Sequence, residues 1–198
     1  MVVPEVHPTH VAKVSELVQA ALGDGDDSSS RYALARDAVN DFQTNDDSPP
    51  SNNELVYGEL SVEVLATILD AVGVKENDVF LDIGSGDGAL VLGASLLYAD
   101  ARCNRNNAMN TCYGVDIVPG LVERSKEHAS NLHEILHDVD RSDDDSDNAF
   151  LQKNQAEMQF LLGDSINQTM NCEIFSKKLH LQSALLPHGA LEMHLVQV

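Results

Sequence analysis

The chain has 198 residues, of which 43% are hydrophobic, and this length and composition suit one domain with a substantial core. Its net charge is −20 with only 12 lysines and arginines, so the surface as a whole should repel nucleic acid and anionic membranes. The three cysteines form no CxxC pair, which favours a reduced intracellular compartment. No apolar run reaches the ~18 residues of a membrane span, and no secretory leader is recognisable, so we expect a soluble, unsecreted protein.

The first 53 residues are predicted to form a helical N-terminal extension. Apolar residues at helical spacing predict a helix over 10–22, and a second short helix is expected over 31–42. Polar residues over 44–53, with a Pro49-Pro50 pair, indicate a linker into the main domain.

Beyond the linker, predicted helices and strands alternate. Ser61 is placed to cap a helix with an apolar face from Val62 to Val72, and Gly73 is placed to end it. The remaining elements expected in chain order are a strand over 79–83, a helix over 89–98, a strand over 112–116, a helix over 119–137, a disordered acidic insertion near 138–150 and a strand over 158–162. This order predicts an α/β fold with a doubly wound, Rossmann-like sheet that binds ligands at the carboxyl ends of its strands.

The stretch from Val79 to Gly88 is the most informative part of the chain, because a hydrophobic run breaks into an acidic residue and three alternating glycines. Glycines let the backbone turn sharply and approach a ligand closely, and the next helix would direct its free N–H groups at that ligand. The spacing Asp82-x-Gly84-x-Gly86-x-Gly88 differs from the GxGxxG of dinucleotide-binding proteins. An acid within the loop would repel a pyrophosphate, but it suits a cationic sulfonium with a free amino group, as in S-adenosylmethionine.

Three aspartates fall at the ends of the predicted strands. Asp116 follows the second strand, where a Rossmann-like site uses a carboxylate to accept hydrogen bonds from ribose hydroxyls. Asp82 could bind an ammonium group or orient the glycine loop, and Asp164 would lie near the base and accept a hydrogen bond from the adenine amino group. Each aspartate alone could equally be a helix cap or a turn residue, but the three together favour a cofactor site.

These motifs resemble a known family. The glycine loop resembles motif I of the class I S-adenosylmethionine-dependent methyltransferases, and Gly114-Val115-Asp116 resembles their acidic second-strand motif. With Tyr57-Gly58-Glu59 upstream, residues 54–165 are similar to the catalytic domain of the disruptor-of-telomeric-silencing histone methyltransferases, which modify a lysine in the core of histone H3.

The resemblance implies a role for each matching residue. Residues 57–59 would belong to a loop that closes over the methionine end of S-adenosylmethionine, and Asp82 with the first two glycines would hold that end from below. Asp116 would bind the ribose, and Asp164 would lie at the adenine. The cofactor-binding residues that we expect are Tyr57, Gly58, Glu59, Asp82, Gly84, Ser85, Gly86, Gly88, Asp116 and Asp164.

The resemblance also implies a reaction, a partner and a location. The reaction would be in-line transfer of a methyl group from the sulfonium to a lysine of a protein substrate, histone H3, in the nucleus. The lysine amine, with an ordinary pKa of about 10.4, must first lose its proton, and a dry channel favours its neutral form. No residue of the chain is assigned as catalytic.

The match weakens toward the C-terminus. Ala89 and Ser165 stand where the family usually has a glutamine or basic residue and an aromatic residue, respectively. The family's asparagine-containing strand, which lines the lysine channel, is not recognisable, and 176–198 form an atypical tail. We therefore expect a methyltransferase domain over 54–175 whose sheet is incomplete at the C-terminus. Either the sequence is truncated or mis-predicted there, or the sheet itself lacks several of the family's strands.

Two other functions stay open. Residues 133–137 form an HExxH motif on a predicted helix, so His133 and His137 could bind zinc with Glu157 as a third ligand while Glu134 activates water, as in a zinc metallohydrolase. The polar surroundings favour an ordinary exposed helix, and we assign no metal site. The other alternative is a non-catalytic half-domain that retains the cofactor pocket or only its scaffold.

Overall fold

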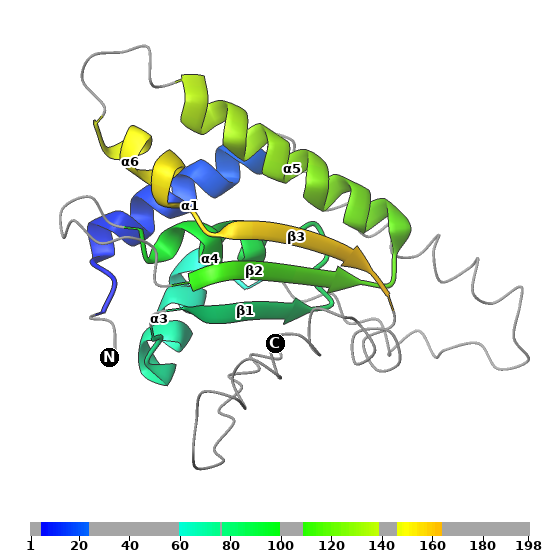
Figure 1. Cartoon of the computed structure of the whole chain (residues 1–198), viewed down its shortest axis with the longest axis horizontal. Coiled ribbons are helices and arrows are strands. Elements are labelled where there is room, and N and C mark those ends of the chain that lie inside the picture. The colour runs from blue at the N-terminus through cyan, green and yellow to red at the C-terminus, as the bar shows by residue number, and fades with distance from the viewer. Residues whose placement is uncertain (1–4, 24–59, 76, 100–108, 139–145, 164–198) are drawn as a thin grey trace, which may run out of the picture.

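The computed structural model describes residues 5–23, 60–75, 77–99, 109–138 and 146–163 (Figure 1). These residues form, in chain order, α1 (Pro8–Leu22), α3 (Val62–Val72), β1 (Asp78–Ile83), α4 (Ala89–Leu97), β2 (Met109–Asp116), α5 (Pro119–Asp138), α6 (Ser146–Asn154) and β3 (Glu157–Leu162). The predicted helix over 31–42, the linker over 44–53 and the tail over 176–198 lie outside the described residues.

The three strands form one parallel sheet in the order β1-β2-β3. Phe80 of β1 is in register with Cys112 of β2, which is in register with Met158 of β3. Because the strands run in the same direction, their carboxyl ends meet at one edge of the sheet, to the right in Figure 1. This arrangement confirms the predicted α/β class with a Rossmann-like sheet. The doubly wound arrangement, with helices on both faces, is not found in the described part of the chain, because the strands follow one another in sequence order.

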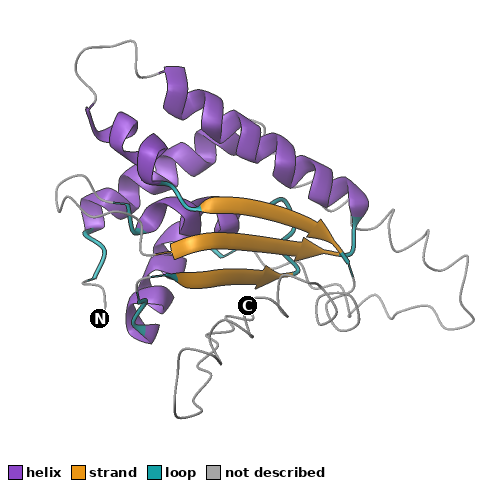
Figure 2. Cartoon of the chain, in the orientation of Figure 1, coloured by secondary structure: helices purple, strands orange, loops and turns teal. Residues whose placement is uncertain are grey.

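The helices that connect the strands pack on one face of the sheet (Figure 2). Both crossovers step across the sheet in the same direction, and crossovers between parallel strands are right-handed as a rule, which puts α4 and α5 on the same side. Side chains alternate along each strand, so Phe80 and Cys112 join the main hydrophobic cluster beneath these helices. Leu81, Tyr113 and Val115 point to the opposite face, where they form a second, smaller cluster.

The N-terminal helix α1 is part of the main core. It packs against α3, α4 and α5, and Val14 and Val18 on its inner face are almost fully buried. Two polar contacts join α1 to the connecting helices: a His10 ring nitrogen lies 3.2 Å from the Leu96 carbonyl, and the Asn131 amide of α5 donates to the Ala21 carbonyl at 3.1 Å. The helical part of the predicted extension therefore contributes directly to the stability of the sheet domain.

The predicted elements differ from the structure mainly at their ends. The second strand begins at Met109, three residues before the predicted start, and the helix after the glycine loop ends at Leu97, one residue early. The acidic insertion was predicted to be disordered up to about residue 150, and this is wrong for its last part, because α6 begins at Ser146. The physical reason is packing: α6 contacts α5, and Leu151 is buried in the main core.

Candidate cofactor site

The glycine loop leaves β1 at its carboxyl end and leads directly into α4. Gly84, Gly86 and Gly88 all have positive φ, at 81°, 55° and 87°. A side chain is strained in this region, so the alternating glycines are a requirement of the turn. Gly88 is the N-cap of α4, and no side chain caps this end of the helix.

Backbone and carboxylate groups of β2 hold the loop from one side. The N–H groups of Gly84 and Ser85 both donate to the Val115 carbonyl, at 2.8 and 3.1 Å. The Gly86 N–H donates to Asp116 Oδ2 at 2.9 Å, and the Val118 N–H donates to Asp116 Oδ1 at 2.8 Å. Asp116 therefore stabilises the turn, as a turn aspartate would. Its oxygens also retain lone pairs that could accept hydrogen bonds from a ligand.

Asp82 lies in the same part of the sheet as Asp116, on the neighbouring strand. Its side chain is buried, and within the described residues no hydrogen bond or ion pair to its carboxylate is found. Burial, and to a lesser extent the negative charge of Asp116, raises the pKa of Asp82 to about 6. Burial also raises the pKa of Asp116, although the hydrogen bonds from Val118, Gly86 and Ile117 act in the opposite direction.

The electrostatics of this carboxylate pair favour a cationic ligand. Asp82 and Asp116 are both buried, and no lysine or arginine of the described residues forms an ion pair with either. Two buried like charges repel each other and lose solvation, and a positive group between them and the solvent would relieve both costs. The site thus fits a ligand with an ammonium or sulfonium group and does not fit a pyrophosphate.

Phe160 of β3 packs closely against the glycine loop, although it is not among the residues that the sequence predicted for the site. A Cβ at Gly88 would lie 2.7 Å from the Phe160 ring, and a Cβ at Gly114 would lie 2.8 Å from the same ring and 2.8 Å from Ser85 Oγ. Gly114 and Phe160 are register partners on adjacent strands, so the ring fills the space that the missing side chain leaves. The alternation of side chains along β3 could have placed Phe160 on the face of the sheet that the helices cover. The sequence could not show that Gly114 is its register partner.

Two exposed apolar residues lie beside the carboxylates. Ile117, directly after Asp116, is 40% exposed, and Leu162, the register partner of Asp116 at the end of β3, is 53% exposed. They combine with Asp116 to give this edge of the sheet an apolar surface next to a hydrogen-bond acceptor. Such a combination suits a nucleoside, which has a flat apolar base and a polar sugar.

The structure does not describe every residue that the sequence predicted for the site. Asp82, Gly84, Ser85, Gly86, Gly88 and Asp116 are brought together at the carboxyl ends of β1 and β2. Tyr57, Gly58, Glu59 and Asp164 lie outside the described residues. Among the helices that the structure describes, none has the length and apolarity that crossing a membrane requires.

The HExxH residues do not converge on a metal site. His133, Glu134 and His137 are on the exposed side of α5, and the amide nitrogen of Gln152 lies 2.6 Å from His137 Nδ1. The proposed third ligand, Glu157, instead accepts a hydrogen bond from Gln159 at 2.7 Å. Within the described residues, no group of three or more histidines, cysteines, aspartates and glutamates could hold a metal ion.

Comparison with known proteins confirms the resemblance that the motifs indicated. Residues 45–139 match the family described as "Histone methylation protein DOT1". A "Histone-lysine N-methyltransferase, H3 lysine-79 specific" from Emericella nidulans is 51% identical over 41 residues. This match covers 21% of the chain and 8% of that relative, so the similarity extends over a small part of each protein.

Two solved structures can be aligned with about half of the chain. YcgJ from Bacillus subtilis is 19% identical, with a TM-score of 0.31, and the alignment covers 51% of this chain and 30% of that one. YjhP from E. coli is 16% identical, with a TM-score of 0.33, and the alignment covers 56% of this chain and 33% of that one.

Proposed function

We propose that this chain is an S-adenosylmethionine-binding methyltransferase domain and that it acts on a lysine of histone H3 in the nucleus. The observation that carries the proposal is the buried carboxylate pair, Asp82 and Asp116, at the carboxyl ends of adjacent strands and next to the glycine loop. The family match over 45–139 supports the reaction class, and the name of the Emericella relative supports the acceptor.

The roles of the described residues follow from their chemistry. Asp82 would attract the positively charged methionine end of the cofactor, because its carboxylate has no neutralising partner in the described part of the chain. Asp116 would accept hydrogen bonds from the ribose hydroxyls with the lone pairs that Gly86 and Val118 leave free. Ile117 and Leu162 would cover the apolar base.

S-adenosylmethionine, when bound, supplies an electrophilic methyl group. The chain contributes to the transfer by holding the cofactor in one orientation, which lowers the entropic part of the barrier. Residues 57–59 and Asp164 complete the proposed site by resemblance to the family. The proposed domain runs over 54–175, after an extension over 1–53.

The test is methyl transfer from S-adenosylmethionine, labelled in its methyl group, to recombinant nucleosomes and to free histone H3. We expect label on H3, and we expect Asp82→Asn to reduce it strongly, with the exposed-site variant Glu123→Gln as the matched control. A chain that binds the cofactor but leaves all histones unlabelled would instead be a non-catalytic binding module. A chain that neither binds the cofactor nor labels a histone would contradict the proposal.

A further inference from the structure

We propose that Ser125 and His128 of α5 are positioning residues of the cofactor site, which hold the glycine loop in its binding conformation. The inference rests on the proposed function and extends it to two side chains outside the glycine motif and its acidic partners. Both side chains are buried, with exposed fractions of 0% and 5%. They are three residues apart and therefore lie on the same face of the helix.

Each of the two side chains contacts a backbone carbonyl of the loop. Ser125 Oγ donates to the Gly86 carbonyl at 3.0 Å, and His128 Nδ1 lies 3.0 Å from the Asp87 carbonyl. A carbonyl oxygen can only accept, so His128 Nδ1 must carry a proton and act as the donor. Two consecutive peptide groups of the loop are thus fixed by one helix.

Helix α5 and strand β2 bind different backbone groups of the same glycine. The Gly86 N–H donates to Asp116, while the Gly86 carbonyl accepts from Ser125, so this residue is fixed at both of its backbone groups. Glycine has more backbone freedom to lose than any other residue, and a loop with three positive-φ glycines has little intrinsic preference for one shape. External hydrogen bonds therefore decide which conformation the loop adopts.

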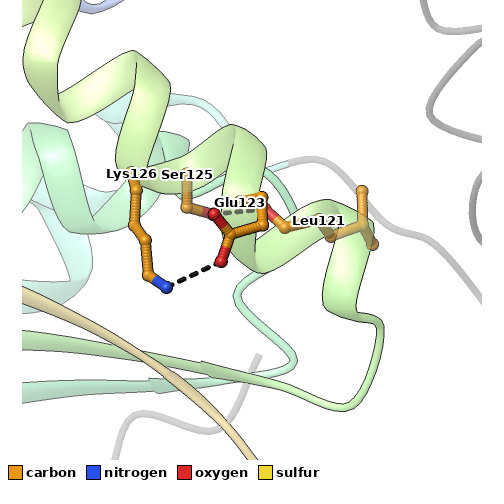
Figure 3. A network of polar contacts seen from close by, with 4 residues as sticks. All are labelled: Leu121, Glu123, Ser125 and Lys126. Atoms are coloured by element: carbon orange, nitrogen blue, oxygen red, sulfur yellow. Dashed lines mark hydrogen bonds and ion pairs between the residues drawn. The ribbon is translucent and has the colours of Figure 1, made fainter.

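The two contacts differ in strength. Ser125 Oγ also lies 2.9 Å from the Leu121 carbonyl of its own helix, so its one proton is divided between two acceptors (Figure 3). His128 has no such competing contact within the described residues, so its bond to the loop is undivided. Lys126, beside Ser125 on the same helix, instead forms an exposed ion pair with Glu123 at 2.8 Å (Figure 3) and provides a control position.

The experiment compares four variants of the full chain: Ser125→Ala, His128→Gln, His128→Asn and Lys126→Ala. An Asn amide nitrogen can occupy the place of Nδ1, whereas a Gln amide reaches beyond it, so His128→Asn retains the donor and His128→Gln displaces it. Two quantities are measured: the Kd for S-adenosylmethionine, and the hydrogen-exchange rates of the Gly86 and Gly88 amides in the ligand-free chain. The Cys112 amide, in the middle of β2, reports on global stability.

We expect His128→Gln to raise the Kd about fivefold, the effect of one neutral hydrogen bond, and Ser125→Ala to raise it by less, because the Ser125 proton is divided between two carbonyls. Both should speed exchange at Gly86 and Gly88 while leaving the Cys112 amide unchanged, and His128→Asn should restore the wild-type values. Lys126→Ala should change neither quantity. Exchange that accelerates equally in the loop and in β2, or in neither, would overturn the proposal. If the wild-type chain binds no S-adenosylmethionine, the proposed function fails. The exchange rates alone then support or refute the proposal that Ser125 and His128 fix the conformation of the glycine loop.

Discussion

Asp82 and Asp116 occupy the carboxyl ends of adjacent parallel strands, and within the described residues the carboxylate of Asp116 is hydrogen-bonded to the glycine loop whereas that of Asp82 is not. Asp116 accepts hydrogen bonds from Gly86 and Val118, so its substitution would disturb the loop as well as remove a charge. Asp82 accepts none within the described residues. Asp82→Asn therefore removes a buried charge with little structural loss, and it is the more informative substitution at this site.

The stability of the chain should depend on pH through Asp82. Its folded pKa of about 6 lies above the ordinary 3.8, so the free energy of unfolding falls as the pH rises from about 4 to about 6. The penalty is absent below about pH 4 and fully present above about pH 6. The difference of about two pH units corresponds to roughly 3 kcal/mol at neutral pH. We expect Asp82→Asn to raise the free energy of unfolding by up to this amount above pH 6 and to have no effect below pH 4.

Urea unfolding of the wild type and the variant between pH 4 and pH 8 measures this difference. Glu123→Gln, at an exposed position on α5, is the control for loss of one negative charge. A stability difference that stays constant across this range would show that the Asp82 carboxylate is not the source.

Steric crowding should make Gly88 less tolerant of substitution than Gly84. Both glycines have φ near +85°, so an alanine at either position carries a similar backbone strain of about 1 kcal/mol. A Cβ at Gly84 meets nothing within 4 Å, whereas a Cβ at Gly88 would lie 2.7 Å from Phe160. Gly88→Ala should therefore cost a further 1–3 kcal/mol, roughly the range for overpacking. Equal losses of stability in the two variants, measured by urea unfolding, would contradict the packing of Phe160 on the loop.

The burial of α1 predicts that its inner face stabilises the sheet domain. Val18 is 1% exposed and belongs to the main core, so Val18→Ala should lower the free energy of unfolding by roughly 2 kcal/mol. Gln19→Ala, at the adjacent exposed position, should change it by less than about 0.5 kcal/mol. If both variants unfold at the wild-type urea concentration, α1 does not pack on this domain in solution.

The histidine pair of α5 should not contribute to a zinc-dependent activity. His133 and His137 form an edge-to-face pair on the exposed side of the helix, with ring centroids 4.2 Å apart and an interplanar angle of 77°. We expect the double variant His133→Ala, His137→Ala to retain the wild-type affinity for S-adenosylmethionine, and we expect a chelator to leave the thermal unfolding midpoint unchanged. Tight, stoichiometric zinc binding that the double variant loses would favour the metallohydrolase alternative.

The sequence allowed the fold class and the position of the site to be predicted because local signals agree there. Ser61 caps α3 through the Val64 N–H, and Gly73 ends it in a left-handed conformation, as the capping pattern predicted. The alternating glycines marked the turn, and Asp116 marked the end of β2. These features depend on neighbours in the sequence, and the backbone geometry follows from the residue type.

Contacts between distant residues could not be predicted in the same way. Phe160 is 46 residues from Gly114, and only the register of β2 with β3 brings the ring to that glycine. His128 belongs to no motif in the sequence, and its bond to the Asp87 carbonyl depends on how α5 docks. The prediction that the acidic insertion is disordered up to about residue 150 was wrong because Leu151 is buried in the core and packs α6 there, in spite of the charged residues before it.

Calorimetric titration of S-adenosylmethionine into the wild-type chain and into Asp82→Asn at neutral pH tests whether the buried carboxylate binds the cofactor. A bond to a buried charged group contributes roughly 1.5–3 kcal/mol, so we expect saturable binding by the wild type and at least about tenfold weaker binding by the variant. Equal affinities of the two proteins, or no binding by a folded wild-type chain, would contradict this expectation.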